Sequence, residues 1–402
     1  MAAPLKTAAA TAGAFVPRAV FEVSPSITRS YFLGHHQGAL TSMRKILSNI
    51  GLVLECRDSR VPLTSANPLL ETALAGRHRV LVYTKSDLCA PASATRWLEK
   101  QQRLLADYQS ERSGITFDRD NDGDGDNDSG SDRGGGRRGG GRRSGADLGG
   151  THVVFTDERN PRSIQRLIDT IKTRATAADS LVGLRALVVG MPNAGKSTLL
   201  NALRRVGMSL PKAARTGAQP GITRKMGTPV RVIAEDSAAG IEQGVFLVDT
   251  PGVFVPYVGD AEAMLKLSLV GCVKDGLVPV EVVADYMLFN LNLRDPAAYA
   301  ELSAPTNDVQ VFLDAVAVRT GKLLKGGVPA REQAADWVVQ QWRKGNLGRF
   351  GLDDVSEENL KARAARERAG EDEHVSMSQA RKKEKEARKV RSAEKRKAAW
   401  GG

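Results

Sequence analysis

The chain has 402 residues, enough for two or three domains, and carries a formal net charge of +12 at pH 7. That excess favours a polyanionic partner, either nucleic acid or an anionic membrane surface, although a basic organellar protein can also lack any nucleic-acid contact. The three cysteines (Cys56, Cys89 and Cys272) are widely spaced, which argues against a zinc site or disulfide framework, and no apolar run approaches the roughly 18 residues of a membrane-spanning helix.

Residues 1–30 are rich in Ala, Thr and Ser, and Glu22 is their only acidic residue. This composition is typical of a mitochondrial transit peptide, whereas a secretory signal would contain a compact apolar core. The alternative is a disordered tail of the same composition. We therefore expect a mitochondrial matrix protein with no transmembrane segment and at most a peripheral association with the inner membrane.

The first predicted elements are an amphipathic helix over residues 39–50 and a strand over residues 52–54. His35 precedes the helix, and Arg57 and Asp58 follow the strand. Functional side chains gather at the carboxyl ends of parallel strands, so Arg57 and Asp58 are expected on the ligand side of the sheet. A structural Arg–Asp ion pair is the alternative.

A second strand, residues 79–84, leads into the sequence Thr84-Lys85-Ser86-Asp87. An aspartate here could accept two parallel N–H bonds from guanine, which adenine cannot offer, while the Lys85 stem lies over the base. The T-K-x-D sequence alone is a weak signal. A further strand, residues 151–155, ends at Thr156, where the last base-contacting loop of a guanine site would lie.

Helices are predicted over residues 91–108 and 160–175. Between them, residues 118–145 are first Asp/Gly-rich and then Arg/Gly-rich, with almost no apolar surface to offset the entropy of ordering. We expect a disordered insertion, whose Arg/Gly half either touches RNA or pairs with the acidic half.

The strongest signal is the sequence from Gly190 to Ser197, which lies between an apolar strand and a helix-compatible run. It fits the phosphate-binding pattern G-x-x-x-x-G-K-[ST] in its strand–loop–helix context. Lys196 would reach the β- and γ-phosphates, and the Ser197 hydroxyl would bind Mg²⁺. Backbone N–H groups and the positive end of the helix would face the same phosphates. The other predicted nucleotide-binding residues of this loop are Asn193, Ala194, Gly195 and Thr198.

Two further motifs complete the phosphate side. A strand over residues 245–249 ends in Asp249-Thr-Pro-Gly252, where Asp249 could hold the water shell of Mg²⁺ and the Gly252 N–H could touch the γ-phosphate. The loop between the two motifs carries Thr223, the predicted second hydroxyl ligand of Mg²⁺ in a segment that orders around a γ-phosphate. Together with the T-K-x-D sequence, these motifs favour GTP over ATP.

After residue 278 the strand signals stop. Residues 280–288, 308–320 and 330–345 have helical spacing, which predicts a small all-α domain over residues 279–352. Its end carries Arg343, Lys344 and Arg349, which suggest either an RNA-facing surface or a solvated helix terminus. Residues 353–402 form a charged, basic tail that either stays solvated or adds phosphate contacts.

The base motifs precede the phosphate motifs, the reverse of the usual order. With this order the chain resembles the circularly permuted ribosome-assembly GTPases of the YlqF/RbgA type, and most of all their mitochondrial branch (mitochondrial GTPase 1-like). The resemblance covers residues 31–352 except the insertion. Besides the permuted motifs, it rests on Tyr31-Phe-Leu-Gly-His-His36, Glu55-Cys-Arg-Asp-Ser-Arg-Val-Pro62, Asn67-Pro68 and Lys344-Gly-Asn-Leu-Gly-Arg-Phe350.

The resemblance implies an α/β fold in which a permuted P-loop GTPase domain, residues 31–275, precedes the all-α domain. It implies a GTP-hydrolysing factor, with GTP and Mg²⁺ as ligands, that acts in assembly of the large mitoribosomal subunit and supports mitochondrial translation. The alternative is a GTP-dependent ribosome- or RNA-binding checkpoint protein with negligible turnover.

Four residues bear on the catalytic mechanism. Val253 stands where many GTPases place a water-orienting glutamine, so intrinsic hydrolysis should be slow. By resemblance, His35 matches a histidine proposed to orient the water, and Asn193 matches an asparagine that holds K⁺ in potassium-activated relatives. Thr84 replaces the more usual asparagine, which removes a loop-bracing amide and predicts a modest nucleotide affinity.

Overall fold

The computed structural model describes residues 15–24, 27, 34–91, 93–113, 151–178, 182–214, 226–255, 258–369, 382 and 385. These residues contain a six-stranded sheet in the order β3-β2-β1-β4-β6-β5. Its neighbouring strands are parallel except for the antiparallel pair β5 and β6. The strands are β1 (Leu52–Asp58), β2 (Arg79–Thr84), β3 (Thr151–Phe155), β4 (Leu184–Gly190), β5 (Val230–Ile233) and β6 (Val245–Asp249).

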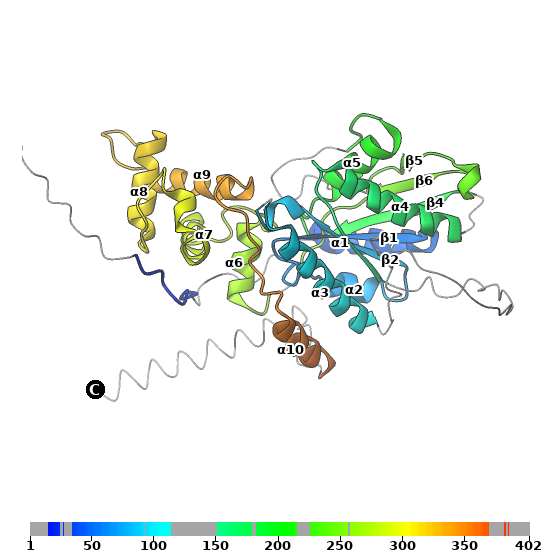
Figure 1. The fold of residues 1–402 in the computed structure, drawn as a ribbon, viewed down its shortest axis with the longest axis horizontal. Coiled ribbons are helices and arrows are strands. Elements are labelled where there is room, and N and C mark those ends of the chain that lie inside the picture. The colour runs from blue at the N-terminus through cyan, green and yellow to red at the C-terminus, as the bar shows by residue number, and fades with distance from the viewer. Residues whose placement is uncertain are drawn as a thin grey trace, which may run out of the picture.

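Helices cover both faces of the sheet, and a helical region follows it in the chain (Figure 1). Those around the sheet are α1 (Gly34–Ile46), α2 (Pro68–Ala73), α3 (Thr95–Ser113), α4 (Pro161–Ala178) and α5 (Lys196–Met208). The later ones are α6 (Ala261–Leu269), α7 (Val280–Arg294), α8 (Val309–Thr320), α9 (Arg331–Arg343) and α10 (Glu357–Arg368). In Figure 1, α6 lies between the sheet and the helices α7, α8 and α9.

Alternating side chains of the central strands explain the two covered faces. In β1, Leu52 and Leu54 join the apolar cluster that contains α4 and α5, whereas Val53 joins the cluster that contains α1 and α2. In β4, Val188 and Leu187 divide in the same way. Successive strand residues point to opposite faces, so a strand that is apolar throughout needs cover on both sides. The predicted fold, a mostly parallel sheet flanked by helices and followed by an all-α region, is confirmed.

Strand β1 extends to Asp58, although its apolar run ends at Leu54. Glu55 and Arg57 are each only 1% exposed, and the Arg57 Nη2 lies 2.6 Å from the Glu55 carboxylate. Glu71 on α2 pairs with the same guanidinium at 2.6 Å. Pairing offsets the cost of burying these charges, so the strand tolerates them. Arg57 therefore lies in a structural ion network, and its expected position on the ligand side is wrong.

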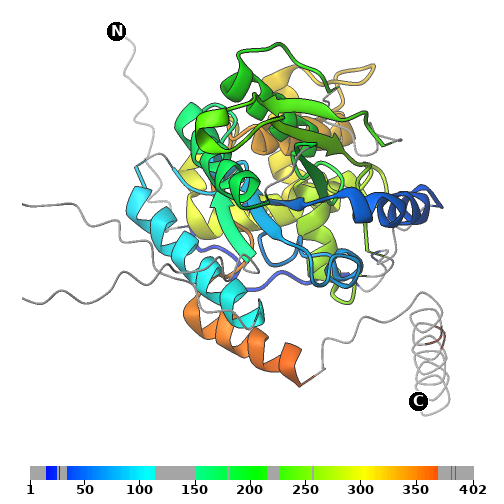
Figure 2. The same ribbon diagram turned by 90° about the vertical axis from the view of Figure 1, so that its right-hand side faces the viewer.

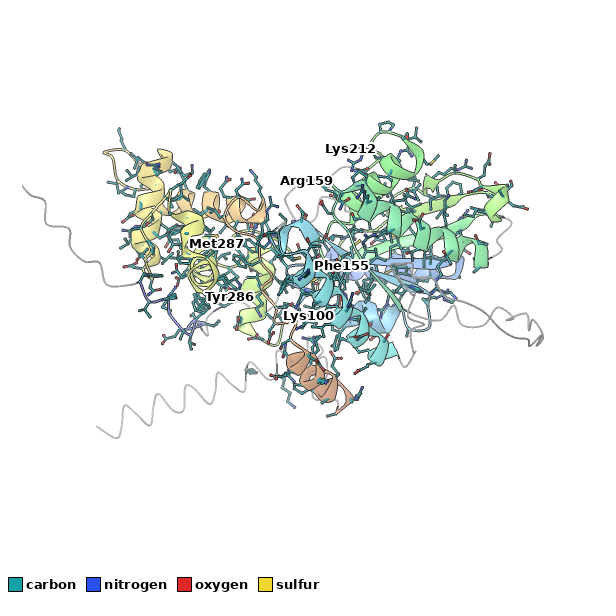
Figure 3. The ribbon with its side chains drawn as sticks, in the orientation of Figure 1. Lys100, Phe155, Arg159, Lys212, Tyr286 and Met287 are labelled. Carbon is teal, nitrogen blue, oxygen red and sulfur yellow. The ribbon has the colours of Figure 1, made fainter. Side chains whose placement is uncertain are left out.

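The helical region shares its apolar cluster with the sheet, and an N-terminal segment packs against it. The Phe21 ring lies 5.2 Å from the ring of Tyr286 on α7, and the Arg18 guanidinium lies 2.5 Å from Asp285. Figure 3 shows Tyr286 and Met287 on α7. Residues 15–24 thus form part of the folded structure, although they fall within the predicted targeting segment 1–30.

Helix α10 falls within the predicted charged tail, yet it packs against α3 (Figure 2). The Tyr108 hydroxyl donates to Glu367 at 2.8 Å, and the Arg112 guanidinium lies 2.9 Å from the same carboxylate. The insertion 118–145 lies outside the described residues, as does nearly all of the chain after residue 369. Within the described part, no helix is both long and apolar enough to cross a membrane.

Candidate functional site

The predicted motifs meet at the carboxyl edge of the sheet. Thr84 ends β2, Gly190 ends β4 and Asp249 ends β6. Strand order reverses at the centre, because β2 and β3 are added on one side of β1, whereas β4 and β6 lie on the other. In open parallel sheets, ligands bind outside the carboxyl ends at such a switch point. The permuted chain therefore brings its two sets of motifs to one crevice.

The loop after β4 has a backbone that only glycine fits at its two ends. Gly190 has φ +143°, and a Cβ there would lie 2.3 Å from the Cys56 carbonyl oxygen. Gly195 has φ +84° and is the N-cap of α5, where no side chain caps the helix. The N-cap residue therefore places no side chain at the start of α5, and the N-terminus of a helix can receive an anion.

Lys196 is buried in this loop. Its ammonium donates to the Met191 carbonyl at 2.7 Å and to the Gly190 carbonyl at 3.3 Å. Burial lowers the pKa of Lys196, and the nearby Asp249 carboxylate opposes that shift. The ammonium is thus held by neutral carbonyl groups, which a phosphate can replace as partners.

Ser197 and Asp249, the predicted magnesium ligands, lie side by side. The Ser197 hydroxyl donates to Asp249 Oδ2 at 2.6 Å. Asp249 Oδ1 is buried and has no hydrogen-bond partner among the described residues. Burial raises the pKa of Asp249, against the hydrogen bond from Ser197 and the charge of Lys196. A hydroxyl beside an under-partnered carboxylate suits Mg²⁺, which prefers oxygen ligands. Thr223, the predicted second hydroxyl ligand, lies outside the described residues.

A cavity of about 240 Å³ opens on the base side of the loop. Asp87, in the turn η2 (Ser86–Leu88), lines it. Burial raises the pKa of Asp87, as does the charge of Asp157, while Arg159 and Arg349 oppose the shift. An under-compensated carboxylate is suited to accept N–H groups from a ligand. The other predicted residues on its lining are Thr84, Lys85, Thr156, Gly195 and Thr198.

The pKa of Asp58 shifts in the opposite direction from that of Asp87. Burial alone would raise its pKa, but the charges of Arg60 and Lys85 outweigh burial and hold the pKa below its ordinary value. Arg60 Nη2 and Lys85 Nζ each donate to Asp58 Oδ2 at 2.8 Å. Asp58 is therefore a structural anchor. It is paired with Arg60 rather than with Arg57.

Lys85 joins the base turn to the phosphate loop. Lys85 and Asn193 are non-glycine residues with left-handed backbone, at φ 57° and 55°. The Lys85 ammonium donates to the Asn193 carbonyl at 2.9 Å. With its charge fixed there, the Lys85 stem lines the cavity. The Asn193 amide in turn donates to the Gly271 carbonyl at 2.8 Å.

Thr84 braces the phosphate loop, contrary to the expectation that its replacement of asparagine leaves the loop without a brace. Its hydroxyl lies 2.9 Å from the Ala194 carbonyl and 3.2 Å from the Arg57 carbonyl. A hydroxyl group has one proton to donate, and the shorter contact, to the Ala194 carbonyl, is taken as its hydrogen bond. The brace is thus a hydroxyl in place of an amide.

Replacing Thr84 by valine keeps the side-chain shape but leaves the buried Ala194 carbonyl without this donor. We expect the free energy of unfolding to fall by about 1–3 kcal/mol and GDP binding to weaken with it. Chemical denaturation and a nucleotide titration measure the two effects. Thr173→Val is the matched control, because its exposed hydroxyl donates to the Asp169 carbonyl one helical turn earlier. An equal loss in both variants would contradict the brace.

The structure describes the remaining predicted residues to different extents. Gly252 packs against the loop, since a Cβ there would lie 2.6 Å from the Pro192 backbone. His35 lies in the first turn of α1, but its side chain is outside the described part. Val253 is buried in the apolar cluster that includes Leu40 of α1.

Eight further residues line the cavity that were not predicted as site residues: Leu88, Glu158, Arg159, Ile164, Leu199, Ala202, Arg343 and Lys344. Figure 3 shows Arg159 on the side of the sheet that faces α9. Arg343 and Lys344 come from the helical region, where the sequence suggested an RNA-facing or solvated end. Lys344 begins one of the patterns that carry the resemblance, and both residues are charged, but neither signal locates a side chain at a cavity.

Comparisons with known proteins agree with this geometry. A family model described as a 50S ribosome-binding GTPase matches residues 185–298. Mitochondrial GTPase 1 of Schizosaccharomyces japonicus is 35% identical over 345 residues, or 84% of this chain and 94% of that protein. Mitochondrial ribosome-associated GTPase 1 of Xenopus tropicalis is 28% identical, over 84% of this chain and 98% of the relative. Ribosome biogenesis GTPase A of Priestia megaterium is 26% identical, over 82% and 98%.

Proposed function

The chain belongs to the mitochondrial GTPase 1 family, and from this premise we propose that it hydrolyses GTP in the crevice between β1 and β4 while docked on the large mitoribosomal subunit. It is a GTPase of mitoribosome assembly, and so supports mitochondrial translation. The mitochondrial matrix is the proposed compartment. The large subunit, both its RNA and its proteins, is the proposed partner.

One observation carries the proposal. Within a single crevice, Asp87 and Asp249 are the two carboxylates whose pKa is raised, mainly by burial. One faces the base cavity and the other adjoins Ser197 at the phosphate loop. Each lacks the compensation that holds the pKa of Asp58 low. A guanine base and a hydrated Mg²⁺ would supply that compensation at the two positions.

Phosphoryl transfer depends mainly on positioned charge and an oriented water. Lys196 exchanges its carbonyl partners for phosphate oxygens, and the Gly252 N–H contacts the γ-phosphate. Ser197 and Asp249, with Thr223 as the second hydroxyl, would hold Mg²⁺, which would supply positive charge against the phosphate oxygens. Asn193 offers an amide oxygen to K⁺ beside the loop.

Val253 cannot orient water, because its side chain is apolar and buried in the cluster that includes Leu40 of α1. Intrinsic hydrolysis is therefore slow, and another group must position the nucleophile. His35 opens α1, the helix that packs in the same cluster as Val253, which makes it the proposed water-orienting residue. The ribosomal subunit would fix this helix and so raise the rate.

We expect GTP hydrolysis by the full chain to rise when large mitoribosomal subunits are added, and to rise more in potassium than in sodium buffer. His35→Ala is expected to lower the stimulated rate about a hundredfold, the usual effect of losing a group that positions or accepts a proton. Phosphate release under multiple-turnover conditions measures both effects.

His36→Ala is the matched control, because it removes the neighbouring imidazole from the same helix turn. Equal losses in both variants would argue that the helix start matters and the His35 imidazole does not. Subunit binding that depends on GTP but brings no stimulation would instead favour a checkpoint protein with negligible turnover. No binding in any nucleotide state would overturn the ribosomal partner.

A further inference from the structure

We propose that the carboxyl end of α9 is part of the nucleotide site, and that the Lys344 ammonium contacts the bound guanine nucleotide. Arg343 and Lys344 line the same cavity as Asp87, although they belong to the helical region. The inference rests on the proposed function, because it places a guanine nucleotide in that cavity. It adds a binding residue from outside the predicted GTPase domain.

The end of α9 lies directly on the base-reading turn. Gly345 follows the helix with φ +81°, and a Cβ there would lie 2.7 Å from Leu88 Cδ2. Leu88 is the last residue of η2, the turn that carries Asp87. The chain can pass this close only because Gly345 has no side chain and accepts a left-handed backbone. The turn that reads the base is therefore packed between the sheet and the helical region.

Polar contacts fix the end of α9 in this place. The Arg343 guanidinium donates to the Ser268 carbonyl at 2.8 Å and to the Leu269 carbonyl at 2.9 Å. Arg343 Nη2 also lies 2.9 Å from the Asp275 carboxylate. These partners anchor α9 to the segment at the end of α6. Arg343 thus lines the cavity, but its guanidinium is already paired with these partners.

A second set of contacts links α9 to the other side of the cavity. The Arg60 guanidinium stacks 4.9 Å from the centre of the Trp342 ring. Arg60 pairs with Asp58, the carboxylate that also holds Lys85. Lys85, Asp58, Arg60 and Trp342 therefore form one chain of contacts from the cavity lining to the buried face of α9. Ordering Lys85 by a nucleotide would stabilise the position of α9.

Lys344 differs from Arg343 because its ammonium is not paired with another described residue. The side chain is exposed at the rim, and its ammonium has no hydrogen bond or ion pair with the described residues. A guanosine diphosphate or triphosphate carries several negative charges, so an unengaged cation on the lining is complementary to it. Lys344 can therefore contact the nucleotide without giving up another partner.

This arrangement makes nucleotide binding and helical-region docking interdependent. A nucleotide that contacts Lys344 binds more tightly when α9 is in place, and by linkage it also holds α9 in place. A ribosomal partner that moved α9 off the turn would weaken nucleotide binding to the same extent. The helical region would then act as a retention element for the nucleotide.

The test is the affinity of the full chain for fluorescently labelled GDP in the variants Lys344→Ala and Lys344→Glu. We expect Kd to rise about threefold for the alanine variant and about tenfold for the glutamate variant, as for loss and reversal of one exposed ion pair. Lys325→Ala and Lys325→Glu are matched controls. Lys325 is an exposed lysine before the other end of α9, about 20 Å away along the helix, and its variants change the net charge equally.

The outcomes separate this inference from the proposed function. If the unmodified chain does not bind GDP, both fail together. If it binds GDP and Lys344→Glu stays within twofold of it, the contact is overturned while the GTPase stands. A loss of the same size in Lys325→Glu would show only a general charge effect and would also overturn the contact. Loss confined to the Lys344 variants supports it.

Discussion

Asp87→Asn is expected to weaken GTP binding by at least about a hundredfold and to let xanthosine triphosphate bind in its place. The carboxylate accepts two N–H groups of guanine, and charge-assisted bonds of this kind contribute about 1.5–3 kcal/mol each. An asparagine amide offers one acceptor and one donor. Xanthine has a carbonyl where guanine has its exocyclic amine, so it matches the new pair. Competition titrations with GTP, xanthosine triphosphate and ATP measure the change.

Asp157→Asn is the matched control for this exchange. Asp157 is a carboxylate near enough to raise the pKa of Asp87, but it is not on the cavity lining. Its amide variant should keep the preference for guanine. A switch to xanthine in the Asp157 variant, or an unchanged preference in the Asp87 variant, would assign base reading to a different residue.

The positions of the chemical groups were predictable wherever a loop motif fixes them by local backbone. The sequence around Gly190 and Gly195 specifies a turn that no other residue type can adopt, so the phosphate loop follows from local chemistry. The order of strands brings the upstream base motif beside it, since β1 and β4 are neighbours. Apolar periodicity located most strands and helices for the same local reason, but it did not indicate α2, β5, α6 or α10.

The role of Asp58 was not predictable, because it depends on distant partners. Asp58 ends β1 and Asp87 lies just after β2, so both are expected at the carboxyl edge of the sheet. Asp58 is neutralised by Arg60 and Lys85, whereas Asp87 is left under-compensated. Three-dimensional packing alone decides between an anchor and a ligand-binding group. The same holds for Arg57, whose partners Glu55 and Glu71 turn a presumed site residue into part of the core.

Contacts between distant segments could also not be predicted from the sequence. Nothing in residues 15–24 indicates that Phe21 packs on α7, because the two phenylalanines and three valines of this stretch follow neither a helical nor a strand period. The need for glycine at position 345 is likewise explained only by its close contact with Leu88, which lies more than two hundred residues earlier in the chain. The contact between Gly345 and Leu88 lies beside the base cavity, and it is visible only in the folded chain.

Lys196→Met is expected to lower GTP hydrolysis at least about a hundredfold without lowering thermal stability. The ammonium is the charge that reaches the phosphates, and removing one such preorganised group typically costs 10²–10³ in rate. Methionine keeps an unbranched apolar side chain of similar length. Burial lowers the pKa of Lys196 in the folded state, so below that pKa its charged form costs stability, and removing that cost offsets the loss of the hydrogen bonds to the Gly190 and Met191 carbonyls. Phosphate release and thermal unfolding measure the two effects.

A loss of activity without a loss of stability would make this variant informative. A loss of activity caused by unfolding would lower both quantities together, and it would contradict the assignment of Lys196 to the phosphates. Lys212→Met is the control, because Lys212 is exposed beyond the end of α5 and belongs to no motif (Figure 3). It should leave the rate unchanged. Burying the Lys196 ammonium costs folding free energy when no nucleotide is bound, but the same ammonium would contact the phosphates of a bound nucleotide. At this residue, the requirement of catalysis therefore opposes that of stability.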